Sequence, residues 1–334
     1  MIVFDDSEFE IALATYNRPE YVKEWLSHCY EPALKRNIAI SVYDSSTNED
    51  TRNYIELFNE SRSVKVNYVR IDSSTIIGYK PMYPILQSSA KFLWVSGDSR
   101  YHDFDELDEL LFSHIHNDEI DYAALAIVNN RENGGKIYTD RSEMIHDFFV
   151  SGTCIGLSVY RLSMFERLKA DPSYKAEMDK HFKDNYAFGW LGYFYHVYAL
   201  KDYKALFVNA KVNEILPGKK VQSWARWFYR CWVDDLLELI DNLPEEYENK
   251  NNIPFEVWKV LFLDSVRYCY RARKKGDLDS EKYEELIRNG KLRRVTRKTG
   301  KIRLFAKGPM FFLKPVYYVN MFLVSIYDTI TRRK

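Results

Sequence analysis

Three apolar segments of the chain each end in a side chain that can bind a polar ligand. FEIALAT ends at Thr15, IAISVYD ends at Asp44, and FLWVSG is followed directly by Asp98. Ser99 and Arg100 come next, so Asp98 stands beside a hydroxyl and a cation. Ordinary turn and strand-end capping uses the same residue types. The sequence therefore predicts either a ligand site or a set of caps at these three positions.

The elements that would position these side chains alternate between strand and helix. We expect strands at 9–16, 38–44, 64–71, 91–97 and 122–128, and helices at 20–35, 50–60, 80–90 and 104–116. This alternation predicts an α/β fold with a doubly wound, mostly parallel sheet and helices on both faces. Ligands of such sheets bind beyond the carboxyl ends of the strands. Thr15, Asp44 and Asp98 all fall at such ends, which favours the ligand site.

Three short motifs at these strand ends carry a family resemblance. They are ATYNRP at 14–19, VYDSST at 42–47 and WVSGDS at 94–99. In this order they resemble glycosyltransferase family 2, whose enzymes have the GT-A fold, and the resemblance covers about residues 8–210. It implies transfer of a sugar from a nucleotide-sugar donor with inversion at the anomeric carbon.

The resemblance implies a donor-binding role for each motif. Thr15 and Asp44 would line the pocket for the base and ribose, with Asn17 beside them, and Arg18 would face phosphate. Asp98 matches the first acid of the family's DxD element. This match implies that Asp98 holds Mn²⁺ or Mg²⁺ between the diphosphate oxygens and so neutralises the leaving group.

The residues around this motif depart from the family pattern. Ser99 and Arg100 stand where further acids are usual. Arg100 would then either supply positive charge directly or point into solvent. In IIGYKPMYP, before the fourth strand, Gly78 and Lys80 are the candidates for phosphate contact, and a solvated surface position is equally open for Lys80.

An inverting transfer also needs a general base that deprotonates the acceptor hydroxyl. The resemblance places this base well after Asp98 and before an aromatic helix, where Asp184 stands in FKDNYAFGW. Asp179 and Asp147 are rivals, and a helix cap is the structural alternative for Asp184.

A further motif bears on how many sugars are added. Gln222, Arg226 and Trp227 are weakly similar to the QxxRW element of processive synthases, with a spacing one residue too long. Those synthases have membrane-spanning helices, and the sequence has no run of 18 apolar residues that would predict one. We therefore expect addition of a single sugar.

The net charge of zero conceals a strong asymmetry. Residues 291–334 contain twelve basic residues and one acid, a net charge of +11, and residues 1–290 carry −11. Aromatic and aliphatic residues are interleaved with these cations, which predicts a tail that binds an anionic membrane surface. The alternative is a terminal helix that packs on the core or on a second subunit. The acidic body argues against nucleic acid as a partner.

Together these features predict three domains: a GT-A catalytic domain at 1–220, a helical extension at 221–290 and the basic tail at 291–334. The expected protein is a bacterial, cytoplasmic glycosyltransferase on the inner face of the membrane, with a UDP-sugar donor and a lipid-linked glycan acceptor for surface polysaccharide. Alternatives are a dTDP-sugar (rhamnosyl) transferase, or an inactive nucleotide-binding scaffold. The sequence leaves the formation of a homo-oligomer open.

Overall fold

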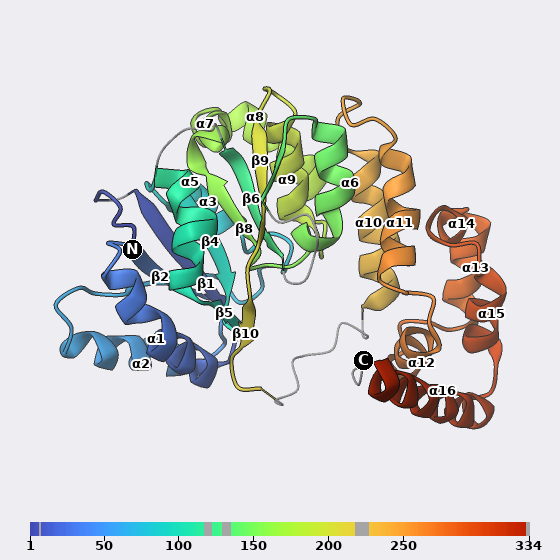
Figure 1. Ribbon diagram of the computed structural model, residues 1–334. Helices are drawn as coiled ribbons and strands as arrows, with labels where there is room; N and C mark the ends of the chain where they lie inside the picture. The colour runs from blue at the N-terminus through green and yellow to red at the C-terminus, as the bar shows by residue number, and fades with distance from the viewer. Residues whose placement is uncertain (7, 117–121, 129–134, 218–226, 332–334) are drawn as a thin grey trace. The chain divides into compact units, whose positions relative to one another are not determined.

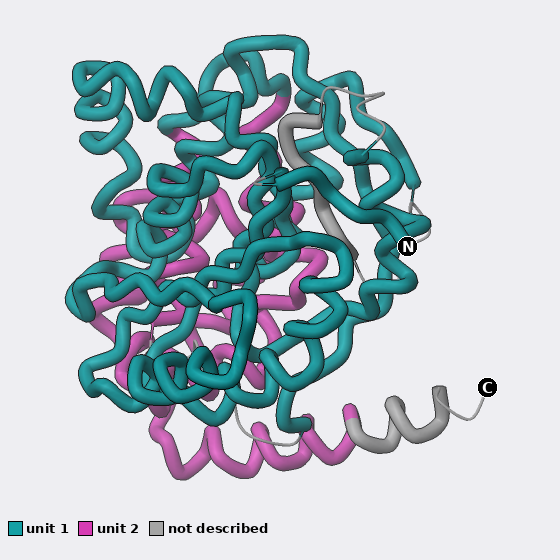
Figure 2. Tube along the Cα trace, turned by 90° about the vertical axis from the view of Figure 1, so that its left-hand side faces the viewer, with its two compact units in different colours: residues 1–219, 242–248 teal, residues 220–241, 249–334 magenta. Residues whose placement is uncertain are grey.

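The computed structural model describes residues 1–6, 8–116, 122–128, 135–217 and 227–331 (Figure 1). The chain divides into two compact units, coloured separately in Figure 2. The first unit comprises residues 1–219 and 242–248, and the second comprises residues 220–241 and 249–334. The range expected to form a separate tail belongs to the second unit, and so does the expected helical extension except for residues 242–248.

A central sheet organises the described part of the first unit. Its strand order is β3-β2-β1-β4-β8-β6-β9-β7. The strands are β1 (Phe9–Thr15), β2 (Ala39–Asp44), β3 (Asn67–Arg70), β4 (Phe92–Gly97), β6 (Tyr122–Val128), β7 (Lys136–Tyr138), β8 (Ser158–Arg161) and β9 (Lys204–Asn209). Strands β3, β2, β1 and β4 are mutually parallel, β6 is parallel to β9, and β8 and β7 run antiparallel to their neighbours. The predicted α/β fold with a mostly parallel sheet is confirmed.

Strand β4 lies in the middle of this sheet, and the burial of its side chains agrees with that position. Its residues Phe92–Val95 are all buried, as expected for a strand covered on both faces. The third strand was predicted to begin at residue 64, which is wrong by three residues. Only Asn67–Arg70 pair with β2, and Val64 is half exposed.

The helices of the first unit surround this sheet. They are α1 (Pro19–Leu34), α2 (Asp50–Glu60), α3 (Met82–Gln87), α4 (Phe104–Leu107), η1 (Asp108–Phe112), α5 (Ser113–His116), α6 (Arg141–Gly152), η2 (Leu162–Phe165), α7 (Glu166–Ala170), α8 (Pro172–Phe182) and α9 (Gly189–Tyr198). A two-stranded sheet pairs β5 (Arg100–His102) with β10 (Val212–Glu214). Helix α1 begins at Pro19, whose fixed φ suits a first turn, and this start fixes where the preceding loop ends.

The second unit is helical where it is described. Its elements are η4 (Arg230–Asp235), α10 (Leu236–Asp241), η5 (Lys250–Asn252), α11 (Ile253–Val260), α12 (Val266–Lys275), α13 (Ser280–Arg288), α14 (Lys291–Val295), α15 (Thr299–Lys307) and α16 (Met310–Thr331). Leu239, Val257 and Leu286 are among its buried side chains. No helix in the described ranges combines the length and the apolar character needed to cross a membrane.

Candidate active site

The three strand ends meet at one edge of the sheet. Strand β1 lies between β2 and β4, with Thr15 in register with Asp44 and Ala14 in register with Gly97. Parallel strands end on the same side, so Thr15, Asp44 and Asp98 come together there, as expected for a ligand site of this sheet type. All three side chains are buried.

Asp98 is almost completely enclosed, with 1% of its surface exposed. Its Oδ2 accepts a hydrogen bond from Thr15 Oγ1 at 2.7 Å, and its Oδ1 lies 2.8 Å from an Arg18 guanidinium nitrogen. The second contact is poorly aligned for a hydrogen bond, so it acts as an ion pair. Burial raises the pKa of Asp98 to about 6, and the charge of Arg18 and the bond from Thr15 oppose that shift.

The loop after β1 brings Arg18 to this carboxylate. Asn17 has φ of 50°, a left-handed conformation that asparagine tolerates better than most residues. Its N–H donates to Ser46 Oγ at 2.7 Å, and its side-chain oxygen accepts from Thr47 N at 2.9 Å. Arg18 is the N-cap residue of α1 but makes no side-chain cap. Its guanidinium is therefore available to Asp98.

Asp44 is completely buried, and both of its oxygens are bound within the protein. Oδ1 accepts from the Ser46 N–H at 2.8 Å and from the Ser46 hydroxyl. Oδ2 accepts from Tyr68 Oη at 2.9 Å and from Arg70 at 3.0 Å. Tyr68 and Arg70 escaped the sequence prediction, although their spacing of two in a strand places them on one face. Asp44 therefore fixes the β2 loop and the end of β3.

Lys80 joins the group from the segment before α3. Its Nζ donates to Ser45 Oγ at 2.7 Å and lies over the Tyr16 ring at 4.7 Å from the centroid. Ser45 Oγ in turn donates to the Thr15 carbonyl at 3.1 Å. Burial lowers the pKa of Lys80, and the nearby Asp44 opposes the shift. Lys80 is thus a second cation near the Thr15–Asp98 pair, and Ser45 links it to the backbone of Thr15.

Gly78 has a packing role that the sequence did not reveal. Its N–H donates to the Tyr186 carbonyl and its carbonyl accepts from Trp190 N, both at 2.7 Å. A Cβ at this position would lie 2.2 Å from the Asn185 carbonyl oxygen. The backbone around Gly78 is therefore filled by protein, and Lys80 is the member of this segment that faces the site.

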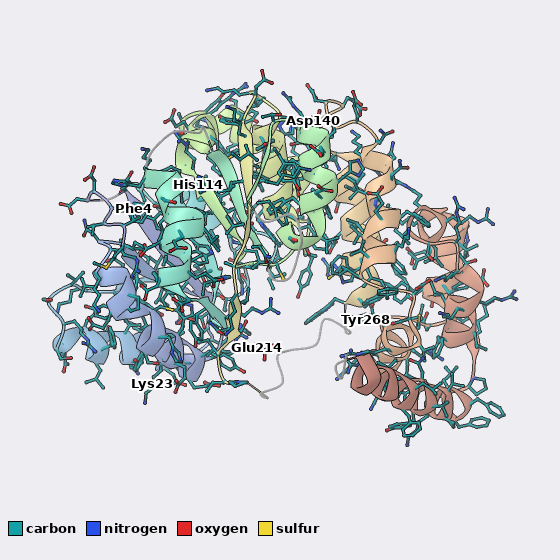
Figure 3. All side chains as sticks on the ribbon, viewed as in Figure 1. Phe4, Lys23, His114, Asp140, Glu214 and Tyr268 are labelled. Atoms are coloured by element: carbon teal, nitrogen blue, oxygen red, sulfur yellow. The ribbon has the colours of Figure 1, made fainter. Side chains whose placement is uncertain are left out.

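Arg100 is separate from Asp98 despite standing two residues away. It begins β5, where its register partner in β10 is Glu214, labelled in Figure 3. The side chain is exposed, and its recorded polar contact is with Cys154 Sγ at 4.0 Å. Its carbonyl accepts from Trp25 Nε1 at 3.1 Å. The structure thus gives the charge-neutralising contact with Asp98 to Arg18.

Asp184 lies in a different environment from the strand-end group. It is exposed and lines a cavity of about 450 Å³ whose wall comes from α3, the preceding segment 74–79 and Lys183. Its carboxylate makes no hydrogen bond or ion pair with any residue that the structure describes. The cap at this turn is Asn185, whose Oδ1 accepts from Phe188 N at 2.9 Å. Asp184 therefore does not cap this turn, and its carboxylate is accessible.

The two rival acids are held by partners. Asp179 accepts from Tyr193 Oη and is paired with Lys175, both at 2.6 Å. Asp147 accepts from Tyr138 Oη at 2.8 Å. Gln222 and Arg226 lie outside the described residues.

A divalent cation does not fit the residues at Asp98 as the structure arranges them. Within the described ranges, no three His, Cys, Asp or Glu side chains cluster as metal ligands. Asp98 offers a single carboxylate, one oxygen of which faces the guanidinium of Arg18. Because a cation already neutralises it, a metal would have to displace Arg18 and take its remaining ligands from water and substrate. The site instead contains two positively charged side chains, Arg18 and Lys80, beside buried acids. Such side chains can bind an anionic ligand such as a diphosphate.

Comparison with known proteins identifies the fold. No protein-family model and no curated protein sequence matches the chain. A solved structure of the mannosyltransferase PcManGT from Pyrobaculum calidifontis, in complex with GDP-Man and Mn²⁺, matches with a TM-score of 0.50 at 12% identity, covering 98% of this chain and 90% of that one. Residues 1–349 of S. aureus TarS match with a TM-score of 0.47 at 14% identity, covering 90% of each chain. Glucosyl-3-phosphoglycerate synthase from Mycobacterium tuberculosis matches with a TM-score of 0.46 at 11% identity, covering 71% of this chain and 81% of that one. The first likeness establishes a glycosyltransferase-like fold, and membership of family 2 stays a prediction.

Proposed function

We propose that this protein is a glycosyltransferase that transfers one sugar from a nucleotide-sugar donor to a glycan acceptor. The observation that carries the proposal is the group formed by Thr15, Asp98, Arg18 and Lys80 at the carboxyl ends of β1 and β4. It lies where α/β sheets bind their ligands, in a fold shared with a mannosyltransferase solved with GDP-Man. Fold alone does not specify activity, so the proposal depends on these residues.

The residues divide the work of donor binding as follows. Asp44, held at the end of β2, and Asn17 would border the base and ribose. Arg18 and Lys80 would face the diphosphate, where positive charge stabilises the leaving group as the glycosidic bond breaks. Asp98 holds Arg18 in place and is a positioning residue. Donor contact by Arg100 stays a prediction, since its side chain contacts Cys154 rather than Asp98.

Asp184 is the proposed general base. Its carboxylate is exposed, lines a cavity and has no described partner, so it can accept a proton from an acceptor hydroxyl. Tyr79 lines the same cavity and lies in the chain directly between Gly78, which is packed against the backbone before α9, and Lys80. A single segment thus borders both the proposed diphosphate site and the proposed acceptor site.

The family resemblance implies a metal at Asp98, and we propose instead that donor binding does not depend on one. Mn²⁺ accompanies GDP-Man in the mannosyltransferase structure, whereas the guanidinium of Arg18 meets the Asp98 carboxylate here. We derive no step through a metal, because the charge that a metal would bring is already present on Arg18 and Lys80.

The first experiment is a thermal-shift screen of UDP-, dTDP- and GDP-sugars, each with Mn²⁺ and with EDTA. A ligand at 100 times its Kd stabilises the folded state by about 2.7 kcal/mol, or roughly 5–10 °C for a unit of this size. We expect one nucleotide class to raise the Tm, with UDP-sugars favoured, and the shift to survive EDTA. A shift abolished by EDTA would restore the metal at Asp98.

Turnover separates the enzyme from a scaffold that only binds nucleotide. We expect nucleotide release in the presence of acceptor, with Arg18→Ala weakening donor binding at least tenfold. Asp184→Asn should keep the thermal shift and lose at least 100-fold in kcat, within the range for a general base. The control Glu60→Gln alters an exposed acid at the end of α2 and should do neither. Binding without turnover for any acceptor would favour the scaffold.

The acceptor and the location of the enzyme complete the proposal. We place the reaction on a lipid-linked glycan at the cytoplasmic face of a bacterial membrane, in surface polysaccharide synthesis. Support comes from the basic charge of residues 291–334, and dTDP-rhamnose remains the alternative donor.

A further inference from the structure

The last helix of the second unit is apolar on the side that faces outward. Its exposed large apolar side chains are Phe311, Phe312, Val316, Tyr318, Val319, Phe322, Leu323 and Val324. At 3.6 residues per turn the first seven fall within one half of the helix circumference, and we call these seven the outer stripe of α16. Phe311 is 69% exposed and Phe322 66% exposed. A helix at the surface of a water-soluble domain ordinarily has the opposite arrangement.

The inward side of α16 is already satisfied by its own unit. Leu313 is buried, and Tyr317 stacks on Tyr270 of α12 with ring centroids 4.4 Å apart. Packing on α12 therefore fixes which side of the helix is outward. The side chains of the outer stripe do not take part in this packing and stay exposed.

The last two helices of the unit also carry exposed cations. Lys301 and Arg303 on α15 and Lys314 on α16 are exposed and form no ion pair with a described residue. Lys314 is the one charged residue between positions 310 and 324. Exposed aromatic rings and exposed cations in the same two helices match the boundary between acyl chains and anionic headgroups, where the rings bury apolar area and the cations meet phosphate.

We propose that the outer stripe of α16 is a docking surface for an anionic lipid bilayer, with the helix lying along the surface. The proposal rests on exposed apolar area and charge in the second unit, so it does not depend on the proposed transferase activity. It also narrows the role of the tail, because α14 and the inner side of α15 are packed inside the unit. Figure 3 shows α16 at the lower right.

Vesicle sedimentation of the full chain tests the proposal. We expect binding to phosphatidylcholine vesicles that contain phosphatidylglycerol to exceed binding to pure phosphatidylcholine by about tenfold or more, since each cation contributes about fivefold. The double variant Phe311→Ser/Phe322→Ser should reduce that binding by at least about tenfold through lost apolar insertion. Its Tm should match that of the wild type, because both rings are exposed.

The matched control is Phe262→Ser, which removes an equally exposed ring, 70% exposed, from a loop of the same unit. It should leave vesicle binding unchanged. Wild-type protein that stays in the supernatant with both vesicle types would overturn the proposal, as would equal losses in the double variant and the control. A second copy as the occupant would appear instead as a dimer in sedimentation velocity that the double variant dissociates, without vesicle binding.

Discussion

At the scale of single residues, Asp98 combines deep burial with two contacts that only partly compensate for it. A buried carboxylate favours its neutral form, and neighbouring positive charge favours the ionised form. The pKa near 6 shows that burial outweighs Arg18 and Thr15. Keeping this acid ionised at neutral pH therefore lowers the stability of the protein, which is common at functional sites.

The first prediction concerns that stability. The pKa of Asp98 is higher in the folded than in the unfolded protein. The free energy of unfolding is therefore highest below about pH 4, where Asp98 is protonated in both states, and falls as pH rises through about 6. Asp98→Asn removes the ionisable group, so we expect the variant to be more stable than wild type at pH 7.5, by up to about 3 kcal/mol. The advantage should vanish near pH 4. Urea unfolding at both pH values measures it.

The matched control for this prediction is Asp202→Asn, since the Asp202 side chain is 97% exposed. That change should leave the pH dependence of unfolding unchanged. A less stable Asp98→Asn protein at pH 7.5 would mean that the ion pair with Arg18 outweighs burial.

The sequence predicted this site unevenly, for physical reasons. Strand ends are readable from apolar runs, so Thr15, Asp44 and Asp98 were correctly placed at one sheet edge. Side-chain partners are not readable in the same way: the pairing of Arg18 with Asp98 depends on the left-handed turn at Asn17. Arg100, although nearer in sequence, is carried away by β5.

At the scale of elements, the segment before α3 is positioned by a glycine. Gly78 exchanges two backbone hydrogen bonds with residues at the start of α9, at a distance that leaves no room for a side chain. Lys80 follows two residues later and reaches Ser45. The placement of this cation is therefore determined by contact between two backbones, which no local propensity reveals.

The second prediction is that Gly78→Ala will disturb both stability and donor binding. The new Cβ would lie 2.2 Å from the Asn185 carbonyl and 2.9 Å from Gly189 N, and backbone atoms cannot move aside as a side chain can. We expect a loss of about 3 kcal/mol in unfolding free energy, the upper range for overpacking, and weaker donor binding by the displaced Lys80. Urea unfolding and donor titration measure the two effects.

Gly300→Ala is the matched control, because a Cβ there meets nothing within 4 Å and the residue lies in α15. It should be neutral or stabilise by about 0.5–1 kcal/mol. Equal stability of the two alanine variants would show that the α3 segment can move away from α9 freely.

At the scale of the whole molecule, part of the basic charge of residues 291–334 forms ion pairs inside the second unit. Lys291 pairs with Asp234 at 2.6 Å and Arg294 with Asp241 at 2.6 Å, while Lys298 lies 3.3 Å from Asp264. The charge asymmetry that the sequence shows is therefore partly a means of holding helices together. Composition could not show this, because it does not record which acids face which bases.

The third prediction distinguishes a packed tail from a free arm by two neighbouring positions of α15. Ile302 is fully buried and Leu304 is 56% exposed. Ile302→Ala leaves a cavity and should cost about 2–5 kcal/mol, whereas Leu304→Ala should change stability by less than about 0.5 kcal/mol. Both variants gain the same helix-favouring residue, alanine. The difference between their unfolding free energies therefore reports how deeply the replaced side chain is buried. Urea unfolding followed by tryptophan fluorescence measures it, because Trp232 and Trp258 of the second unit contribute to the signal. Two equally small effects would mean that α15 does not pack in the second unit.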